Sequence, residues 1–196
     1  MQDFTQWEVI GRGAERVCYL NPDDPTRCIK VSHKSQAKQS RREIHYLHYL
    51  YKRGVAFAHI PAFYRIVETD EYIGMEQERI MNPSGLQPLD LRHYLQQPLS
   101  TEQQNAFWQA IQQLKEYLIE NNVIPCDLVM SNMLVLEQGE SIKIMMIDGF
   151  GDAAWFPIAN YVRYFGQRKI ERKWTKFIER MLQPHFEQYQ TSSRHL

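Results

Sequence analysis

The stretch Ile124-Pro125-Cys126-Asp127-Leu128-Val129-Met130-Ser131-Asn132-Met133-Leu134-Val135 has the strongest chemical pattern in the chain. Asp127 and Asn132 stand five positions apart, between the end of a predicted helix and an apolar run typical of a strand. Sixteen residues after Asn132, a second apolar run ends at Asp148, which Gly149 follows. An aspartate beside glycine at a strand end is often only a turn residue. Oxygen side chains at neighbouring strand ends can also hold Mg²⁺ together with phosphate, and this predicts a metal site.

The residues around this stretch predict helices and a small hairpin. Ser100 with Gln103 forms a capping-box pattern at the start of a helix that ends near Asn121-Asn122. The apolar face of this helix consists of Phe107, Ile111, Leu114 and Leu118. Residues 133–136 and 142–147 are typical of strands around a turn at Gly139. Residues 89–96 predict a short helix, and residues 158–190 have a helical pattern.

The first 80 residues predict mostly strands. Residues 7–10, 16–20 and 27–31 are β-prone runs that indicate an antiparallel meander, and residues 63–68 and 71–80 indicate a hairpin across Thr69-Asp70. Residues 35–53 predict a helix, and the Pro- and Gly-containing segment 81–89 is the expected linker. We therefore predict an α+β, two-lobed fold: residues 1–80 form a small β-rich lobe with one helix, and residues 81–196 form a mainly helical large lobe.

Three features of the small lobe bear on function. Gly11 and Gly13 at a strand end would let backbone N–H groups approach phosphate, although an ordinary hairpin turn has the same pattern. Lys30 lies in an otherwise apolar strand. It is either a functional residue or an ordinary lysine on a solvent-exposed face of the strand. Glu43 lies on the apolar stripe of the next helix, beside Leu47. A buried carboxylate needs a partner, and Lys30 is the candidate.

The order of these features resembles the protein-kinase-like superfamily over about residues 7–151. The resemblance implies a catalytic role for Asp127 and metal binding by Asn132 and Asp148. It likewise implies a phosphate loop at Gly11 and Gly13. Lys30 would then neutralise the phosphates of ATP and be held by Glu43. More narrowly, the sequence is similar to the PhoP regulatory network protein family of the YrbL type, which implies a magnesium- and stress-responsive regulatory context.

The resemblance also implies where adenine binds. Cys18 and Cys28 would line its pocket, and the backbone of Glu78-Arg79-Ile80 would contact the base between the lobes. Either Gln77 or Met75 would face the pocket. We therefore expect an ATP- and Mg²⁺-dependent phosphotransferase of kinase-like fold with a reduced C-terminal lobe.

Departures from the kinase pattern favour an unknown small-molecule or anionic acceptor over a peptide. Arg16 replaces the third loop glycine, Val129 replaces the lysine after the catalytic aspartate, and Gly149 replaces the phenylalanine of D-F-G. Only 48 residues follow Asp148, which leaves no room for the peptide-docking helices of protein kinases. The alternative is a catalytically inactive, nucleotide-binding pseudokinase that acts as a regulatory or scaffolding protein.

Composition narrows the class of protein further. The 23 basic and 23 acidic side chains cancel, which argues against nucleic acid as a partner. The three cysteines form no CxxC pair, and no signal peptide or membrane-spanning run is visible, so a cytoplasmic location is expected. The basic segment 163–180 predicts a helix that packs its aromatic residues, among them Phe165, Trp174 and Phe177, with Met181 just beyond it. Its exposed face would attract an anion or a membrane surface.

Overall fold

The structure is a computed structural model that describes residue 4 and residues 6–139 and 141–190. The chain folds into two compact units. The first comprises Met1–Phe57 and Pro61–Arg79, and the second comprises Ala58–Ile60 and Ile80–Leu196. The sequence-based division was placed between residues 80 and 81. Antiparallel sheets and separate helices make the fold α+β.

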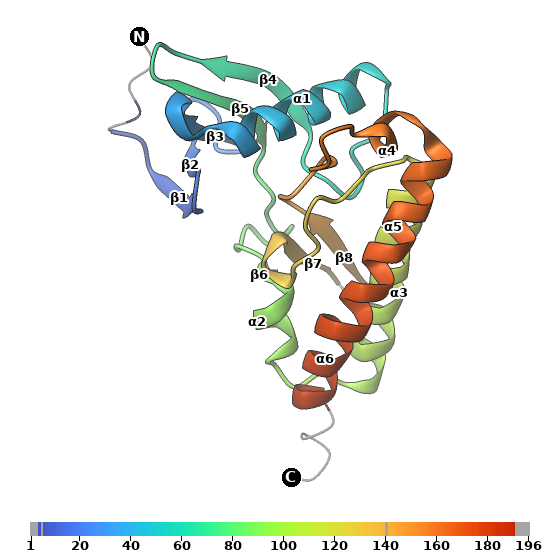
Figure 1. The fold of residues 1–196 in the computed structure, drawn as a ribbon. Coiled ribbons are helices and arrows are strands. Elements are labelled where there is room, and N and C mark those ends of the chain that lie inside the picture. Colours follow the sequence, from blue (N-terminus) through green and yellow to red (C-terminus); the bar gives the residue numbers. More distant parts are fainter. Residues whose placement is uncertain (1–3, 5, 140, 191–196) are drawn as a thin grey trace. The chain divides into compact units, whose positions relative to one another are not determined.

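A five-stranded antiparallel sheet forms the first unit (Figure 1). Its strands, in spatial order, are β1 (Val9–Arg12), β2 (Val17–Leu20), β3 (Arg27–His33), β5 (Tyr72–Glu78) and β4 (Phe63–Glu68). The predicted meander and the predicted hairpin are both confirmed. The hairpin joins the meander through β5, which pairs with β3 and so lies between β3 and β4.

The two faces of this sheet have different partners. Ser32 of β3 shares a hydrogen bond of 2.6 Å with Ser40 of α1 (Lys38–Lys52), so this strand face is the one that looks toward the helix. A short 3₁₀ turn, Lys34–Gln36, precedes α1. On the opposite face Ile29 and Val31 pack with Phe4 and Val67 in a small apolar core.

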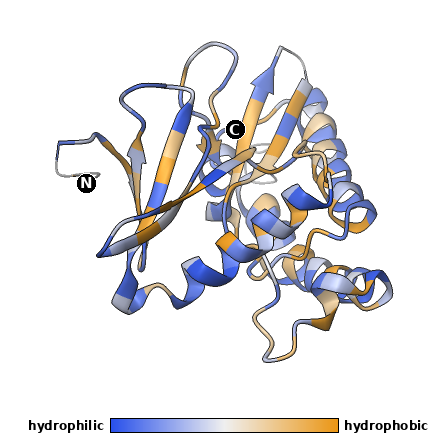
Figure 2. Cartoon of the chain, turned by 90° about the horizontal axis from the view of Figure 1, so that it is seen from above, coloured by the Kyte–Doolittle hydropathy of each residue, from blue (hydrophilic) through white to orange (hydrophobic). Residues whose placement is uncertain are grey.

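The second unit is built on a long helix and a three-stranded sheet. The helix is α3 (Thr101–Glu120), and both hydrogen bonds of the predicted capping box at Ser100 are present. All four residues of its predicted apolar face are buried. The sheet has the order β6 (Leu89–Asp90), β7 (Met133–Gln138) and β8 (Ser141–Met146). In Figure 2 the strands carry hydrophobic segments, whereas hydrophilic and hydrophobic stretches alternate along the helices, as expected for amphipathic helices.

The predicted helix over residues 89–96 is wrong at its start. Leu89 and Asp90 pair with Val135 and Leu134 as the strand β6, and the helix α2 spans only Leu91–Leu95. The Asp90 side chain accepts a hydrogen bond from the His93 N–H at 2.9 Å, which satisfies a free donor at the helix start. The capping aspartate therefore marks the boundary between strand and helix.

The predicted helical pattern over residues 158–190 is confirmed but consists of four segments. They are α4 (Ile158–Tyr161), α5 (Arg163–Phe177), a π-helical turn η3 (Ile178–Leu182) and α6 (Gln183–Gln190). Trp174 and Phe177 are buried, whereas Phe165 is exposed, so the prediction that the aromatic residues of this segment pack is wrong for Phe165. Met181, just beyond the segment, is exposed as well. Within the described part of the chain, no helix combines the length and apolar character needed to cross a bilayer.

Candidate functional site

In the second unit, Asn132 and Asp148 stand at neighbouring ends of paired strands. Asn132 ends the 3₁₀ turn η2 (Met130–Asn132), which leads directly into β7, and Asp148 follows the end of β8. Met133 of β7 pairs with Met146 of β8, and the Ile147 N–H donates to the Asn132 carbonyl at 2.8 Å. The backbone therefore brings the two predicted metal-binding residues to one edge of the small sheet.

The Asp127 loop is bound to the segment that follows Asp148. The Cys126 N–H donates to the Gly149 carbonyl at 2.6 Å, and the Gly151 N–H donates to the Ile124 carbonyl at 2.8 Å. A single antiparallel bridge joins Pro125 to Phe150. These bonds hold the loop that carries Asp127 along residues 149–151.

Gly149, which follows Asp148, lies close to the Asp127 backbone and to the Asn132 side chain. Its φ is +80°, a conformation that glycine adopts easily and other residues rarely do. A methyl group on its Cα would lie 2.9 Å from the Asp127 carbonyl oxygen and 3.2 Å from the Asn132 side-chain nitrogen. The Asp127 carbonyl and the Asn132 side chain therefore leave no space for a side chain at position 149, and glycine fits there.

Two lysines of α5, one helical turn apart, reach this region. Lys173 donates to the Cys126 carbonyl in the Asp127 loop, and Lys169 forms an ion pair with the buried carboxylate of Asp152. Burial lowers the pKa of Lys173, while the nearby charge of Asp127 acts in the opposite direction. The sequence showed these lysines only as part of a basic helix. Their spacing of four residues was the available signal that they share a face.

In the first unit, Glu43 is fully buried and paired with an arginine. The Arg16 guanidinium lies 2.9 Å from the Glu43 carboxylate, and both side chains are at least nine-tenths buried. The sequence had presented Arg16 only as the residue that replaces a loop glycine. Glu15, its neighbour, accepts a hydrogen bond from the Gln39 N–H of α1 at 3.2 Å. The β1–β2 turn is therefore attached to α1 at two points.

Lys30 is buried on the strand face that looks toward α1. Lys30 is two positions before Ser32, whose hydroxyl contacts Ser40 of α1. Side chains two positions apart in a strand point to the same face, so Lys30 also points to this side of β3. In the sheet, Lys30 lies opposite Cys18 on β2 and Met75 on β5. The direct contact of Lys30 with Glu43 stays a prediction.

The register of the sheet also places the residues expected near adenine. Cys28 lies opposite Gln77, two positions from the Lys30–Met75 pair, so both Met75 and Gln77 are on the Lys30 face. Contact with the Cys18 thiol, together with burial, raises the pKa of the Cys28 thiol. The two open alternatives for the strand position that faces the pocket therefore lie on the same side of the sheet.

The backbone predicted to contact adenine is partly occupied. The Glu78 N–H donates to the Ala62 carbonyl at 2.9 Å, and the Arg79 N–H donates to the Thr26 carbonyl at 2.8 Å. The Glu78 carbonyl accepts a weak bond from the Cys28 thiol at 3.8 Å. Ile80, the last residue of the predicted segment, belongs to the second unit and is buried there. Neither Glu78 nor Arg79 can offer its N–H to a base without losing a bond.

The two glycines of the predicted phosphate loop lie in a simple turn. Gly11 pairs with Cys18, and the Gly13 N–H donates to the Arg16 carbonyl at 2.8 Å. A side-chain carbon at either glycine would meet its nearest neighbour at 3.6 Å or more, and neither glycine has a positive φ. The turn itself therefore does not require glycine at these positions. Their role toward phosphate stays a prediction.

The profile of the family described as PhoP regulatory network protein YrbL matches residues 3–182. The chain belongs to this family. Its relatives include the protein YrbL of Escherichia coli (strain K12), which is 32% identical over 173 residues. That alignment covers 86% of this chain and 82% of the relative, and the YrbL protein of Shigella flexneri gives the same values. The similarity therefore extends over both units.

The family member described here has a sparse set of oxygen ligands. Among the residues that the structure describes, no group of three or more His, Cys, Asp or Glu side chains is arranged to hold a metal ion. Asn132 and Asp148 would supply two oxygen ligands. Two protein ligands suit Mg²⁺ when it is bound together with phosphate oxygens and water, as it commonly is in nucleotide sites. The residues present therefore fit a metal that arrives with a nucleotide.

Proposed function

We propose that this protein is an ATP- and Mg²⁺-dependent phosphotransferase of kinase-like fold. Its acceptor would be a small molecule or another non-peptide compound, and its setting a PhoP-type regulatory network. The observation that supports the proposal best is the contact of Asp127 and Asn132 with Gly149, next to Asp148. The Asp127 backbone and the Asn132 side chain lie close to Gly149, and Asp148 precedes it in the chain.

The predicted residues would have separate roles in the reaction. Lys30 would neutralise the phosphates of ATP, because a buried ammonium ion has few competing water molecules. Asp127 would orient the acceptor hydroxyl and accept its proton. Asn132 and Asp148 would hold Mg²⁺, which spreads the charge of the phosphates when it is bound. Glu43 would be a positioning residue that holds Lys30, and its own carboxylate is held by the ion pair with Arg16.

The family itself supports the regulatory setting, because the family description names the PhoP network. The acceptor class is proposed from the departures from the kinase pattern, above all Val129 in place of the lysine after the catalytic aspartate.

A nucleotide-binding pseudokinase is the second candidate, and one observation favours it. The β1–β2 turn is fixed to α1 through Arg16 and Glu15. Such a site would bind nucleotide without the loop movements that usually accompany turnover. The two candidates differ in the role of Asp127.

The test compares aspartate variants in nucleotide binding and in slow ATP hydrolysis, which needs no known acceptor. Asp148→Asn should abolish Mg²⁺-dependent ATP binding and hydrolysis together. Asp127→Asn should leave ATP affinity within a few fold but lower hydrolysis by roughly 10²–10⁴, the usual size of a general-base contribution. Asp70→Asn, in the exposed β4–β5 turn, is the matched control and should change neither.

The outcomes separate the candidates. Equal hydrolysis rates in the wild type and in Asp127→Asn, with ATP binding intact, would favour the pseudokinase. Absence of binding by the wild type at millimolar ATP with Mg²⁺ would refute both candidates.

A further inference from the structure

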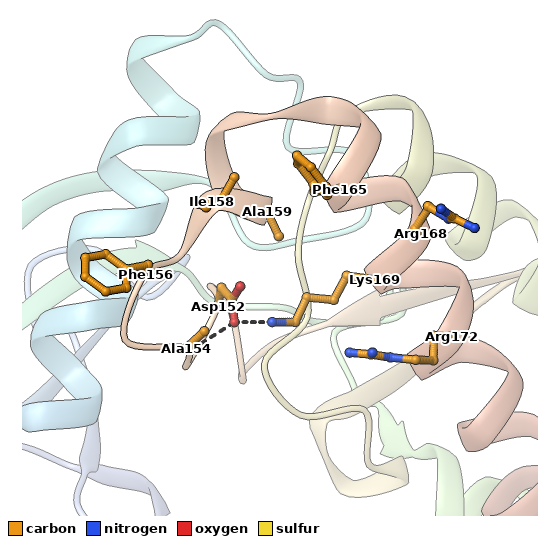
Figure 3. A pocket seen from close by; sticks show the side chains of 9 residues that line it. All are labelled: Asp152, Ala154, Phe156, Ile158, Ala159, Phe165, Arg168, Lys169 and Arg172. Carbon is orange, nitrogen blue, oxygen red and sulfur yellow. Dashed lines mark hydrogen bonds and ion pairs between the residues drawn. The ribbon is translucent and has the colours of Figure 1, made fainter.

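A pocket of about 570 Å³ opens in the second unit where α4 and the start of α5 face the segment after Gly151 (Figure 3). This volume is within the range of small-molecule sites, about 300–1,000 Å³. The pocket belongs wholly to the second unit and contains none of the three residues assigned to metal binding or proton transfer.

One wall of the pocket is apolar and open to solvent. Phe156, Ile158 and Phe165 line it, with 75%, 53% and 53% of their surfaces exposed. Large apolar side chains clustered in a hollow and left exposed commonly mark a binding surface. The helical spacing of Phe165 predicts that it packs with Trp174 and Phe177, but the structure leaves it exposed on this wall.

The other wall is basic, and its single acid is already neutralised. Asp152 is buried and forms an ion pair with Lys169, and it also accepts a hydrogen bond from the Ala154 N–H at 2.9 Å. In Figure 3 the side chains of Lys169 and Arg172 extend to the same side, whereas Arg168 points away. Arg168 is bonded to the Tyr164 hydroxyl at 2.9 Å. Among the described residues, no acidic side chain forms an ion pair with Arg172.

We infer that this pocket binds a small amphipathic anion. The acidic group, a carboxylate or phosphate, would be bound by Arg172, whose planar guanidinium suits bidentate contact with either. The apolar part would cover Phe156, Ile158 and Phe165. Lys169 neutralises Asp152 and Arg168 points away, so the charge of Arg172 remains in the lining and selects an anion over a neutral or cationic amphiphile. Binding would require no nucleotide.

The probe for the test is monomeric octyl phosphate, kept below its micelle concentration and titrated by calorimetry without ATP. Octyl phosphate should bind, whereas octyl glucoside and octyltrimethylammonium should bind at least tenfold more weakly. Hexyl and butyl phosphate should bind about fourfold more weakly for each methylene removed, if each lost CH₂ forfeits its full burial. Phe165→Ser should reduce this dependence on chain length.

Variants of the basic wall provide the decisive comparison. Arg172→Glu should weaken octyl phosphate binding by roughly 10–100-fold, the usual range for a charge-assisted hydrogen bond. Arg180→Glu makes the same charge change on an exposed residue of η3 outside the pocket, and it should have little effect. Arg172→Gln removes the charge without reversing it and serves if the first variant folds poorly.

Two results would overturn the inference. One is octyl phosphate binding that is equally strong in Arg172→Glu, Arg172→Gln and the wild type. The other is binding to vesicles that contain phosphatidylglycerol with no binding of monomeric octyl phosphate, which would assign the basic segment 163–180 to a membrane surface instead. Because neither assay includes ATP, failure here leaves the phosphotransferase proposal untouched.

Discussion

Replacing Gly149 by alanine should damage the candidate site far more than the same change at another glycine with a similar backbone. Gly149 and Gly139 both have positive φ, +80° and +67°. A methyl group at Gly139 meets nothing within 4 Å, whereas at Gly149 it would lie 2.9 Å from the Asp127 carbonyl oxygen. Comparing Gly139→Ala with Gly149→Ala therefore separates the free-energy cost of the backbone conformation from the cost of steric contact with the Asp127 loop.

The magnitudes follow from these two costs. A non-glycine residue at positive φ costs about 1–2 kcal/mol, and we expect Gly139→Ala to show the lower value. Gly149→Ala adds an overpacking cost of about 1–3 kcal/mol, because its closest neighbour is backbone that cannot rotate away. For a chain of this size, 1 kcal/mol shifts the melting temperature by about 2–4 °C. The two costs of Gly149→Ala sum to about 2–5 kcal/mol, so the expected shifts are about 2–4 °C for Gly139→Ala and about 4–20 °C for Gly149→Ala.

The assay is thermal unfolding followed by circular dichroism, together with ATP binding in the presence of Mg²⁺. Gly149→Ala should weaken Mg²⁺-dependent binding, since the added methyl group displaces the backbone between Asp127 and Asn132. Gly139→Ala should leave binding unchanged. Equal melting temperatures for the two variants would refute the close packing of the Asp127 loop against Gly149.

Three further predictions concern other parts of the chain. Glu43→Gln should destabilise the first unit by about 3–5 kcal/mol, because it removes the charge of a fully buried carboxylate from its ion pair with Arg16. Glu68→Gln, which loses an exposed ion pair, should cost about 1 kcal/mol or less, and urea unfolding measures both variants. Burial lowers the pKa of His59 below its usual 6.5, so below that pH the unfolded chain binds more protons than the folded one, and acidification reduces stability. His59→Gln should show a shallower loss of stability between pH 6.5 and 5. Because its pKa is raised, Cys28 should react with iodoacetamide more slowly than Cys126 at neutral pH, as read by mass spectrometry, and similar rates would contradict the assigned burial of Cys28.

Local signals in the sequence were sufficient for several elements. The capping box at Ser100 and the stripe that begins at Phe107 define α3, because caps and helical periodicity depend on residues only three or four positions apart. The β4–β5 hairpin could be predicted for the same reason. The order of Asp127, Asn132 and Asp148 along two strand ends was enough to expect them together, since paired strands carry their end residues to one edge.

Other features depend on contacts that spacing does not encode. Leu89 forms a strand because β7 is available to pair with it, although its own sequence favours a helix. Arg16 forms an ion pair with Glu43, which is 27 positions away in the sequence. The residues next to Arg16 in the sequence do not distinguish it from a solvent-exposed loop arginine. The helical spacing of Phe165 correctly placed it on α5 but could not show which side of the helix the rest of the unit covers.

The attachment of the β1–β2 turn to α1 has a mechanical consequence for the first unit. Arg16 binds Glu43, and Glu15 binds the backbone of Gln39 about one helical turn nearer the start of α1. Because of these two contacts, a displacement of the turn displaces α1, and a displacement of α1 displaces the turn. The hairpin and the helix therefore move together. A displacement of α1, such as one caused by a partner bound to its outer surface, would also displace Gly11 and Gly13.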